Sequence, residues 1–316
     1  MRKFLCFALR KFVVLLFFLA GITLVAFLLG VAAPGDPALA VMTMDGITEP
    51  TVGQLAVLRH EMGLDLPLYE QYIRWLLGAA LGDFGTSYIT GRPVLQELVT
   101  RFPVTFKLSV CALGWVVSLG IPLGLWSAMK LNKPAEIFVR FVVIFFLSVP
   151  GFWLAIILIM ILSEELTLLP SSGYGTFRHW LMPSFVLAAG SAAAVVRVQK
   201  VAALEVMEKD FVLTERAKGL PWDFVIKKHV FPNALMPVIT MLGTFFGAVL
   251  GGSVIVEDLF SLPGIGSYVL SAVWSRDYPV IQGYVVVSGT VFVVFNYLVD
   301  MSYYLLNPLI RIEEKR

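Results

Sequence analysis

Charged residues are scarce in this chain of 316 residues, where Asp, Glu, Lys and Arg together make up 15%. Soluble domains carry about 25% charged and about 45–50% apolar residues, whereas 58% of the residues here are hydrophobic. The shortage of charge excludes a soluble globule, a disordered chain and a fibrous protein, and it is typical of a membrane protein with several spans. A net charge of +2 gives no reason to expect nucleic acid as a partner.

Groups that could hold a cofactor or carry out catalysis are also few. The two cysteines, Cys6 and Cys111, lie far apart without CxxC spacing, so neither a disulfide nor a metal site is expected. None of the three histidines has a second histidine or a cysteine at metal-ligand spacing. The sequence also lacks a GxxxxGK[ST] phosphate loop and a GxSxG nucleophile turn. We therefore expect no cofactor, no metal site and no catalytic residue, and a partner has to supply any energy for transport.

Six apolar runs are long enough to cross a bilayer, which takes about 20 helical residues. The first, residues 12–33, follows basic residues as in a signal peptide. It exceeds the 7–15 apolar residues or so of such a peptide, and we interpret it as a retained helix. The other runs cover roughly residues 104–128, 136–162, 180–203, 234–256 and 282–306. The sequence predicts an all-α polytopic membrane protein with six transmembrane helices.

The basic residues are distributed unevenly between the two sides of this arrangement. With the N-terminus inside, 17 of the 24 Lys and Arg residues fall in inner segments, so the positive-inside rule places both termini in the cytoplasm. Four parts are predicted: a cytoplasmic N-terminus with the first transmembrane helix (1–33), an extracytoplasmic loop (34–103), a five-helix core (104–306) with a cytoplasmic loop at 204–233, and a cytoplasmic tail (307–316).

The extracytoplasmic loop is expected to contain an amphipathic helix over Pro67–Leu81. Four apolar side chains recur every fourth residue in this segment and would form one stripe along a helix. They are Leu68, Tyr72, Leu76 and Ala80.

The cytoplasmic loop carries the strongest local signals. Gly219 followed by Leu220 and Pro221 predicts a left-handed helix cap and a new helix start. Four side chains of the second helix, residues 221–230, fall at i, i+3, i+4 and i+7 and form an apolar face: Trp222, Val225, Ile226 and His229. This face could lie on lipid or dock into a groove of a partner protein. Periodicity alone does not separate the two alternatives.

Two runs in this loop resemble the coupling loop of ABC-importer permeases. They are Asp210-Phe-Val-Leu-Thr-Glu-Arg-Ala-Lys-Gly219 and His229-Val-Phe-Pro-Asn-Ala-Leu-Met-Pro237. Gly219 and Pro232 match the glycine and the proline of the general pattern E-A-A-x3-G-x9-I-x-L-P, but its E-A-A positions read Leu213, Thr214 and Glu215. The pattern A-R-A-K-G of the dipeptide/oligopeptide/nickel permease family fits better, because residues 215–219 read Glu-Arg-Ala-Lys-Gly.

Short runs along nearly the whole chain are similar to signatures of the same family. Each is weak alone, and their order and spacing carry the resemblance. They include Pro34-Gly-Asp-Pro37, Gly82-Asp-Phe-Gly-Thr-Ser87, Pro150-Gly-Phe-Trp153, Pro263-Gly-Ile-Gly266, Arg276-Asp-Tyr-Pro279 and Asn307-Pro-Leu-Ile-Arg311. This favours docking on a partner protein over docking on lipid.

The resemblance implies a non-catalytic permease subunit in a bacterial inner membrane. Its partners would be a second homologous permease, two cytoplasmic ATPase subunits, an extracytoplasmic solute-binding protein and the lipid bilayer. Gly219 would supply the left-handed turn and Pro232 would end the docked helix. The resemblance identifies no residue of the substrate pathway, and it assigns the following residues to ATPase coupling: Glu215, Ala217, Lys218, Gly219, Trp222, Val225, Ile226, His229 and Pro232.

The cargo is the open point, because this family carries di- and oligopeptides, nickel and metal chelates. The short link from Ser172 to Pro183 looks more like the nickel branch, so nickel or a metal chelate is preferred, with a peptide as the alternative. A stand-alone secondary transporter or channel would call for inverted repeats or a set of pore-lining charges, and neither is visible. A membrane scaffold without transport is a further, more remote alternative.

Overall fold

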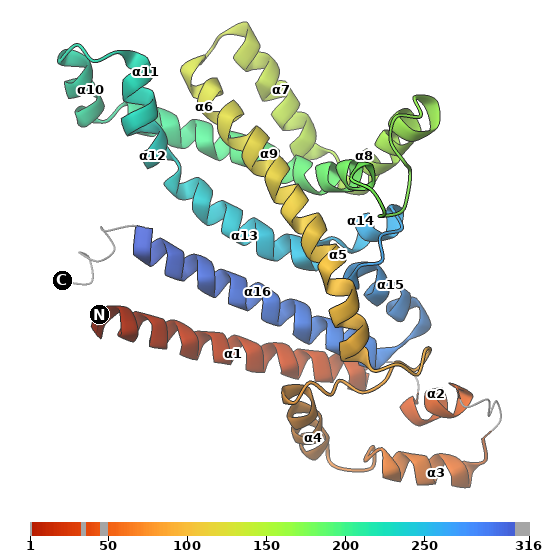
Figure 1. Ribbon diagram of the computed structural model, residues 1–316. Helices are drawn as coiled ribbons and strands as arrows, with labels where there is room; N and C mark the ends of the chain where they lie inside the picture. The colour runs from red at the N-terminus through yellow and green to blue at the C-terminus, as the bar shows by residue number, and fades with distance from the viewer. Residues whose placement is uncertain (1, 33–35, 45–49, 307–316) are drawn as a thin grey trace. The chain divides into compact units, whose positions relative to one another are not determined.

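The computed structural model describes residues 2–32, 36–44 and 50–306 (Figure 1). These residues form helices and no strand, apart from one isolated antiparallel bridge between Thr86 and Pro93. The all-α class predicted from the sequence is confirmed. The predicted cytoplasmic tail, residues 307–316, lies outside the described residues.

The α-helices are interrupted by three π-helical segments, η1 to η3. In chain order the elements are α1 (Arg2–Ala32), α2 (Pro37–Met44), α3 (Val52–Glu61), α4 (Leu68–Ala80), α5 (Val94–Trp115), η1 (Val116–Gly120), α6 (Ile121–Met129), α7 (Pro134–Ser148), α8 (Gly151–Leu158), η2 (Ile159–Glu165), α9 (Arg178–Met207), α10 (Asp210–Ala217), α11 (Trp222–Val225), η3 (Ile226–Val230), α12 (Phe231–Ala234), α13 (Met236–Gly252), α14 (Val254–Leu259), α15 (Ile265–Ser275) and α16 (Tyr278–Leu306).

Four helical segments of the described chain are long and apolar enough to cross a membrane unaided: Leu9–Ala32, Val94–Met129, Arg178–Met207 and Tyr278–Leu298. Two bent pairs raise the number to six if each pair is one span. They are Pro134–Ser148 with Gly151–Glu165, bent by 107°, and Trp222–Ala234 with Met236–Val249, bent by 46°. Each predicted span therefore has a helical counterpart, but the third is broken near its middle and a bend precedes the fifth.

The 107° break lies at Val149 and Pro150, which both have extended backbone conformations. Proline has no N–H with which to continue a helix, and its ring disfavours the α conformation in the preceding residue. The Pro150-Gly-Phe-Trp153 signature therefore marks the point at which α7 ends and α8 begins.

The chain divides into two compact units. The first unit combines Met1–Val104 with Pro263–Tyr297, and the second combines Thr105–Leu262 with Leu298–Arg316. In the first unit α1 and the first part of α16 lie side by side (Figure 1). A Cβ on Gly289 would fall 2.9 Å from Ile22 of α1, so a glycine is needed for this close approach.

The amphipathic helix predicted in the long loop is present as α4, which packs against α1. Tyr72 shares a hydrogen bond of 3.0 Å with Thr23, and the rings of Tyr72 and Trp75 lie 5.4 and 6.0 Å from the ring of Phe27. The inward face differs from the predicted stripe, because the end members Leu68 and Ala80 are exposed. The helix was predicted correctly, but its inward face was assigned correctly only in its middle, at Tyr72 and Leu76.

A buried aspartate ties two signature runs of the first unit together. The Asp277 side chain is 2% exposed and accepts hydrogen bonds from the Ser87 hydroxyl at 2.5 Å and the Tyr88 backbone N–H at 3.0 Å. The Arg276-Asp-Tyr-Pro279 run thereby fixes the end of the Gly82-Asp-Phe-Gly-Thr-Ser87 run.

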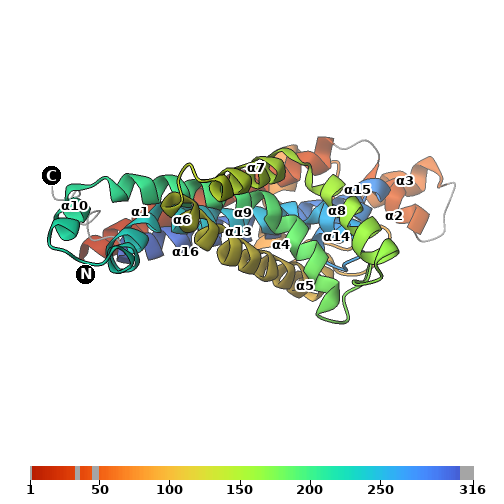
Figure 2. The ribbon, with the colours of Figure 1, turned by 90° about the horizontal axis from the view of Figure 1, so that it is seen from above.

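The second unit is built around α9, which packs against α6, α7, α8 and α13. Figure 2 shows α10 beyond one end of α9 and α8 towards the other. Close packing depends on Gly120 and Gly124, where an added Cβ would fall 2.6 Å from Val195 and Gln199 respectively. The unit therefore has a closely packed central helix that leads directly into the predicted coupling loop.

Candidate functional site

The predicted coupling loop turns sharply where α10 ends. Gly219 has φ +81°, its N–H donates to the Arg216 carbonyl at 2.9 Å, and the Leu220 N–H donates to the Glu215 carbonyl at 3.4 Å. This pair of hydrogen bonds is the Schellman arrangement of a helix C-terminus. The predicted left-handed conformation of Gly219 is confirmed. A Cβ at this position would meet no atom within 4 Å, so it is the backbone conformation that requires glycine.

The helix after this turn runs without interruption from α11 through η3 to α12. Pro232 cannot donate to the carbonyl four residues earlier and crowds it. The hydrogen bonds before it widen into a π-helical turn, in which the Phe231 N–H donates to the Ile226 carbonyl. The expectation that Pro232 ends the helix is therefore wrong, since the helix continues to Ala234 and the 46° bend follows it.

One side of this helix is buried by the chain itself. Val225 and Val230 are fully buried and Ile226 is 3% exposed. They belong to one hydrophobic cluster with residues of α6, α9, α10 and α12, among them Ala128, Ala203, Val206, Val212 and Ala234. The sequence predicted that Val225 and Ile226 belong to a face open to lipid or to a partner. That prediction is wrong, because the chain itself buries both side chains. They anchor the loop to α9 instead.

Two aromatic rings of the helix are exposed, each beside a cation. Trp222 is 37% exposed, and the Arg216 guanidinium carbon lies 4.9 Å from its ring centre. Phe224 is 42% exposed, with Lys228 Nζ at 5.0 Å. Cation–π attraction of this kind orders exposed rings. Sequence reasoning missed Phe224, because it lies outside the apolar stripe.

A shallow hollow of about 410 Å³ lies beside Phe224, and Asp223, Lys227 and Lys228 complete its lining. Two lysines against one aspartate give this hollow a net positive charge. Ala217 and Lys218 are also exposed, at the end of α10.

Glu215 and His229 lie together, although fourteen positions separate them in the sequence. His229 Nδ1 is 3.2 Å from Glu215 Oε1, and both side chains are largely buried. The contact joins α10 to η3 across the glycine turn. Glu215 Oε2 is buried and has no hydrogen-bond partner among the described residues, so contacts within this part of the chain leave one acceptor of the carboxylate unsatisfied.

A buried ion cluster fixes α7 to α9 in the same unit. The Glu136 side chain is 1% exposed and contacts Lys200 Nζ at 2.5 Å and Arg140 Nη2 at 2.7 Å. Lys200 lies on α9, close in sequence to Ala203 and Val206 of the hydrophobic cluster. Sequence analysis did not identify this cluster. The i, i+4 spacing of Glu136 and Arg140 was visible, whereas nothing in the sequence pointed to Lys200.

The chain matches two models of known families. The model described as "Binding-protein-dependent transport system inner membrane component" matches residues 120–312, and "Binding-prot-dependent transport system membrane comp, N-term" matches residues 1–109. The chain belongs to this family. The resemblance to ABC-importer permeases is thereby confirmed, and the predicted coupling loop of this permease lies inside the first matched region, residues 120–312.

Two curated relatives cover most of the permease. "Glutathione transport system permease protein GsiC" of Pectobacterium atrosepticum is 40% identical over 88% of this chain and 90% of its own length. The protein of the same name from Escherichia coli strain K12 is 35% identical over 92% of this chain and 94% of its own length.

Two solved structures share the fold of the permease. A chain of the MetNI methionine ABC transporter in inward-facing conformations has a TM-score of 0.55 at 18% identity, and it covers 66% of this chain and 94% of its own length. An amino acid ABC transporter with histidines has a TM-score of 0.51 at 16% identity over the same shares.

The relatives do not support the preference for nickel that we drew from the short link between Ser172 and Pro183. They carry a glutathione name and favour the peptide alternative. Short outer segments vary among relatives with little effect on the core, so the length of one link was weak evidence for cargo.

Proposed function

We propose that the permease translocates short peptides across a bacterial inner membrane and is itself non-catalytic. A second homologous permease, two cytoplasmic ATPase subunits and an extracytoplasmic solute-binding protein would complete the importer. The observation that carries the choice of cargo is the 40% identity to a glutathione permease over nine-tenths of that protein's length. The match to the binding-protein-dependent transport family supports the proposed set of partner subunits.

The coupling loop is proposed as the docking surface for one ATPase. Trp222, Phe224 and Lys218 would contact the ATPase, because all three side chains are exposed. Gly219, Pro232 and the Glu215–His229 pair would set the shape of the loop, and Val225 and Ile226 would transmit its motion to α9 through the hydrophobic cluster. Closure of the ATPases on ATP would then rock the two permeases between inward- and outward-facing states.

The proposed topology has both termini in the cytoplasm. Residues 34–103 would lie outside, and the core, residues 104–306, would carry the coupling loop at 204–233 on the inner side. The support is the excess of basic residues in the inner segments.

The solute held by the binding protein tests the cargo. The binding protein encoded with this permease would be purified from cells under non-denaturing conditions and its bound solute identified by mass spectrometry. We expect a short peptide of the glutathione type. A nickel ion or a metal chelate as the sole solute would refute the peptide assignment.

Co-purification in detergent tests the docking surface. Trp222→Ala combined with Phe224→Ala should reduce ATPase recovery more than tenfold, since burying a large apolar side chain contributes about 1.5–3 kcal/mol. Phe177→Ala is a matched control, because Phe177 is 73% exposed and lies at the opposite end of α9. Normal ATPase recovery with the double variant would reject this surface. Ile226→Asp is unsuitable here, because it would disrupt the core of the loop.

A further inference from the structure

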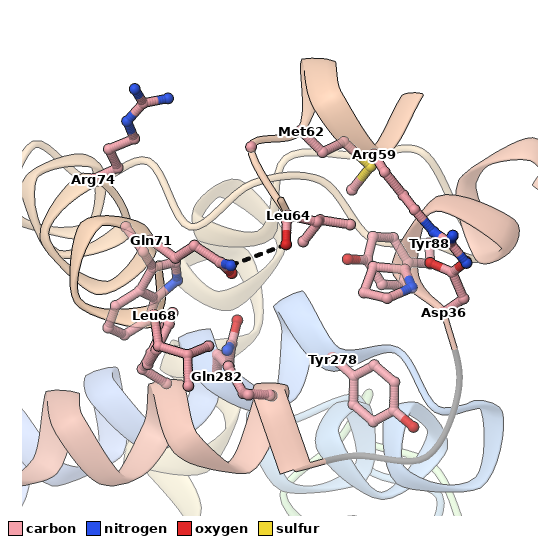
Figure 3. Close-up of a pocket in the computed structure, with 16 residues that line it drawn as sticks. Asp36, Arg59, Met62, Leu64, Leu68, Gln71, Arg74, Tyr88, Tyr278 and Gln282 are labelled. Atoms are coloured by element: carbon pink, nitrogen blue, oxygen red, sulfur yellow. Dashed lines mark hydrogen bonds and ion pairs between the residues drawn. The ribbon is translucent and has the colours of Figure 1, made fainter. Parts of the chain in front are cut away.

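A cavity of about 740 Å³ lies in the first unit, where α1, α3, α4 and the start of α16 meet (Figure 3). Phe27, Leu68 and Trp75 supply apolar walls. Pockets for small organic ligands commonly measure about 300–1,000 Å³ and combine apolar walls with a few polar groups. The cavity thus has the size and lining for a ligand of a few residues, and it is separate from the coupling loop.

Charged groups lie at the two ends of this cavity. Figure 3 shows Asp36 and Arg59 at one end and Arg74 at the other. Asp36 accepts from Arg59 Nε at 3.0 Å and Nη2 at 2.5 Å, whereas no carboxylate of the described chain forms an ion pair with Arg74. The lining itself holds two guanidinium groups and one carboxylate, so it carries a net positive charge. The Asp65 carboxylate, outside the lining, also interacts with the Arg74 charge. The lining therefore favours a zwitterionic or anionic ligand.

Two neutral hydrogen-bonding groups lie between the ends without a partner among the described residues. The Gln282 amide offers a donor and an acceptor, and the Tyr88 hydroxyl can donate. Burial and the nearby Asp277 charge raise the pKa of Tyr88 to about 12, so its hydroxyl stays protonated. The Gln71 Nε2 donor is not available to a ligand, because it already donates to the Leu64 carbonyl at 3.1 Å and the Leu66 carbonyl at 2.7 Å.

We propose that this cavity is a receiving site for a short peptide with a free carboxylate. The carboxylate would pair with Arg74, the peptide amides would bond to Gln282 and Tyr88, and the Asp36 carboxylate would face the ammonium group. A guanidinium group recognises a carboxylate through two parallel hydrogen bonds. The inference rests on the proposed function and deepens it, because it places a cargo contact in this chain outside the path between the two permeases.

Photolabelling of the whole importer tests the site. The assembly, in nanodiscs and without ATP, would be labelled with a photoreactive tripeptide in its carboxylate form and in its carboxamide form. We expect labelling of cavity residues by the carboxylate form, reduced about tenfold for the carboxamide form and about tenfold by Arg74→Gln. Gln282→Met keeps the length of the side chain, removes its amide and should reduce labelling by both forms.

Arg92→Gln is the matched control, because Arg92 is an exposed arginine of the same unit that pairs with Glu97 outside the cavity. It should leave labelling unchanged. Equal labelling by the two peptide forms, or no effect of Arg74→Gln and Gln282→Met, would overturn the proposal. Displacement of the label by glycerophosphoethanolamine as effectively as by unlabelled tripeptide would also overturn it, and would assign the cavity to lipid headgroups.

ATP-driven uptake of the same tripeptide, measured in the same preparation, separates this proposal from the proposed function. Uptake without labelling of the cavity would refute the receiving site and leave the importer function intact. Absence of uptake for every peptide tried would count against the peptide function itself.

Discussion

Gly219 and Pro232 shape the proposed coupling loop through their backbones, and they differ in how far the sequence predicted their roles. The left-handed turn at Gly219 followed from local chemistry, because glycine is the residue that enters this conformation without strain. The effect of Pro232 did not follow, since a missing N–H can end a helix or widen it. The cluster formed by Val225, Ile226 and Val230 holds the helix on both sides of the π turn, and the helix continues.

Gly219→Val should impair transport and leave membrane insertion intact. A β-branched residue at φ +81° is strained by more than the 1–2 kcal/mol or so of an ordinary residue. Gly219→Asn is the matched control, because asparagine tolerates the left-handed region. Uptake per inserted complex should fall in the order Gly, Asn, Ala, Val. Full activity of the valine variant would show that the turn is not needed.

The His60–Asp65 pair at the end of α3 gives a pH-dependent prediction. Its atoms lie 2.6 Å apart, and the Asp65 carboxylate raises the pKa of His60 while the imidazole lowers the pKa of Asp65. The stabilisation from His60 is complete below its ordinary pKa of 6.5 and is lost as the pH rises through the raised value. The stabilisation from Asp65 is complete above its ordinary 3.8 and is lost as the pH falls through the lowered value. Both contributions are therefore present between these two ordinary values.

An NMR titration of ¹³C-labelled histidine measures this directly. Asp65→Asn should lower the pKa of His60, because it removes the acceptor charge. His229 is the internal control, since it pairs with a different carboxylate. An unchanged His60 titration in Asp65→Asn would contradict the pairing.

At the scale of elements, periodicity identified the helices but not what covers their apolar faces. The spacing of Val225 and Ile226 correctly indicated one apolar side, yet α9 and α10 bury that side. The stripe assigned to α4 likewise included the exposed Leu68 and Ala80 and missed Trp75, which packs against α1 together with the correctly assigned Tyr72. A spacing of 3.6 residues specifies an orientation about a helix axis. The identity of the covering partner depends on contacts between residues far apart in the sequence.

The Glu136 cluster that joins α7 to α9 is a long-range contact of this kind, and its loss should destabilise the second unit. Glu136→Gln leaves Lys200 without its carboxylate in a site where its side chain is 19% exposed. Breaking a buried pair costs about 3 kcal/mol. Arg140→Gln is the matched control, because Arg140 is 48% exposed and a surface pair contributes less than about 1 kcal/mol. Thermal unfolding in detergent should show a clearly larger drop in Tm for Glu136→Gln, and equal drops would refute the role of the Lys200 contact.

At the scale of the whole molecule, hydropathy located all six apolar runs, because a bilayer demands long helices without charge. It did not show that two of them are bent pairs. The bends of 107° and 46° depend on local interruptions near Pro150 and Pro237. The cavity around Arg74 and Gln282 could not be predicted from the sequence either, because its lining comes from segments far apart in the chain.

Cysteine labelling tests the proposed topology. With Cys6 and Cys111 replaced by alanine, a Gly53→Cys variant should react with a membrane-impermeant maleimide in intact spheroplasts. A Cβ at Gly53 meets no atom within 4 Å, so the thiol will be accessible. A Lys218→Cys variant should react only after the membrane is opened. The reverse pattern would overturn the orientation derived from the basic residues.

Uptake by purified components in proteoliposomes tests the central claim most directly. The claim is that this chain is a permease that moves short peptides only when separate ATPases drive it. The complete importer with its binding protein should accumulate a radiolabelled short peptide such as glutathione when ATP is supplied to the ATPase side. Omitting this permease, or supplying a non-hydrolysable ATP analogue, should abolish accumulation. Accumulation driven by an ion gradient in liposomes that contain this chain alone would contradict the account.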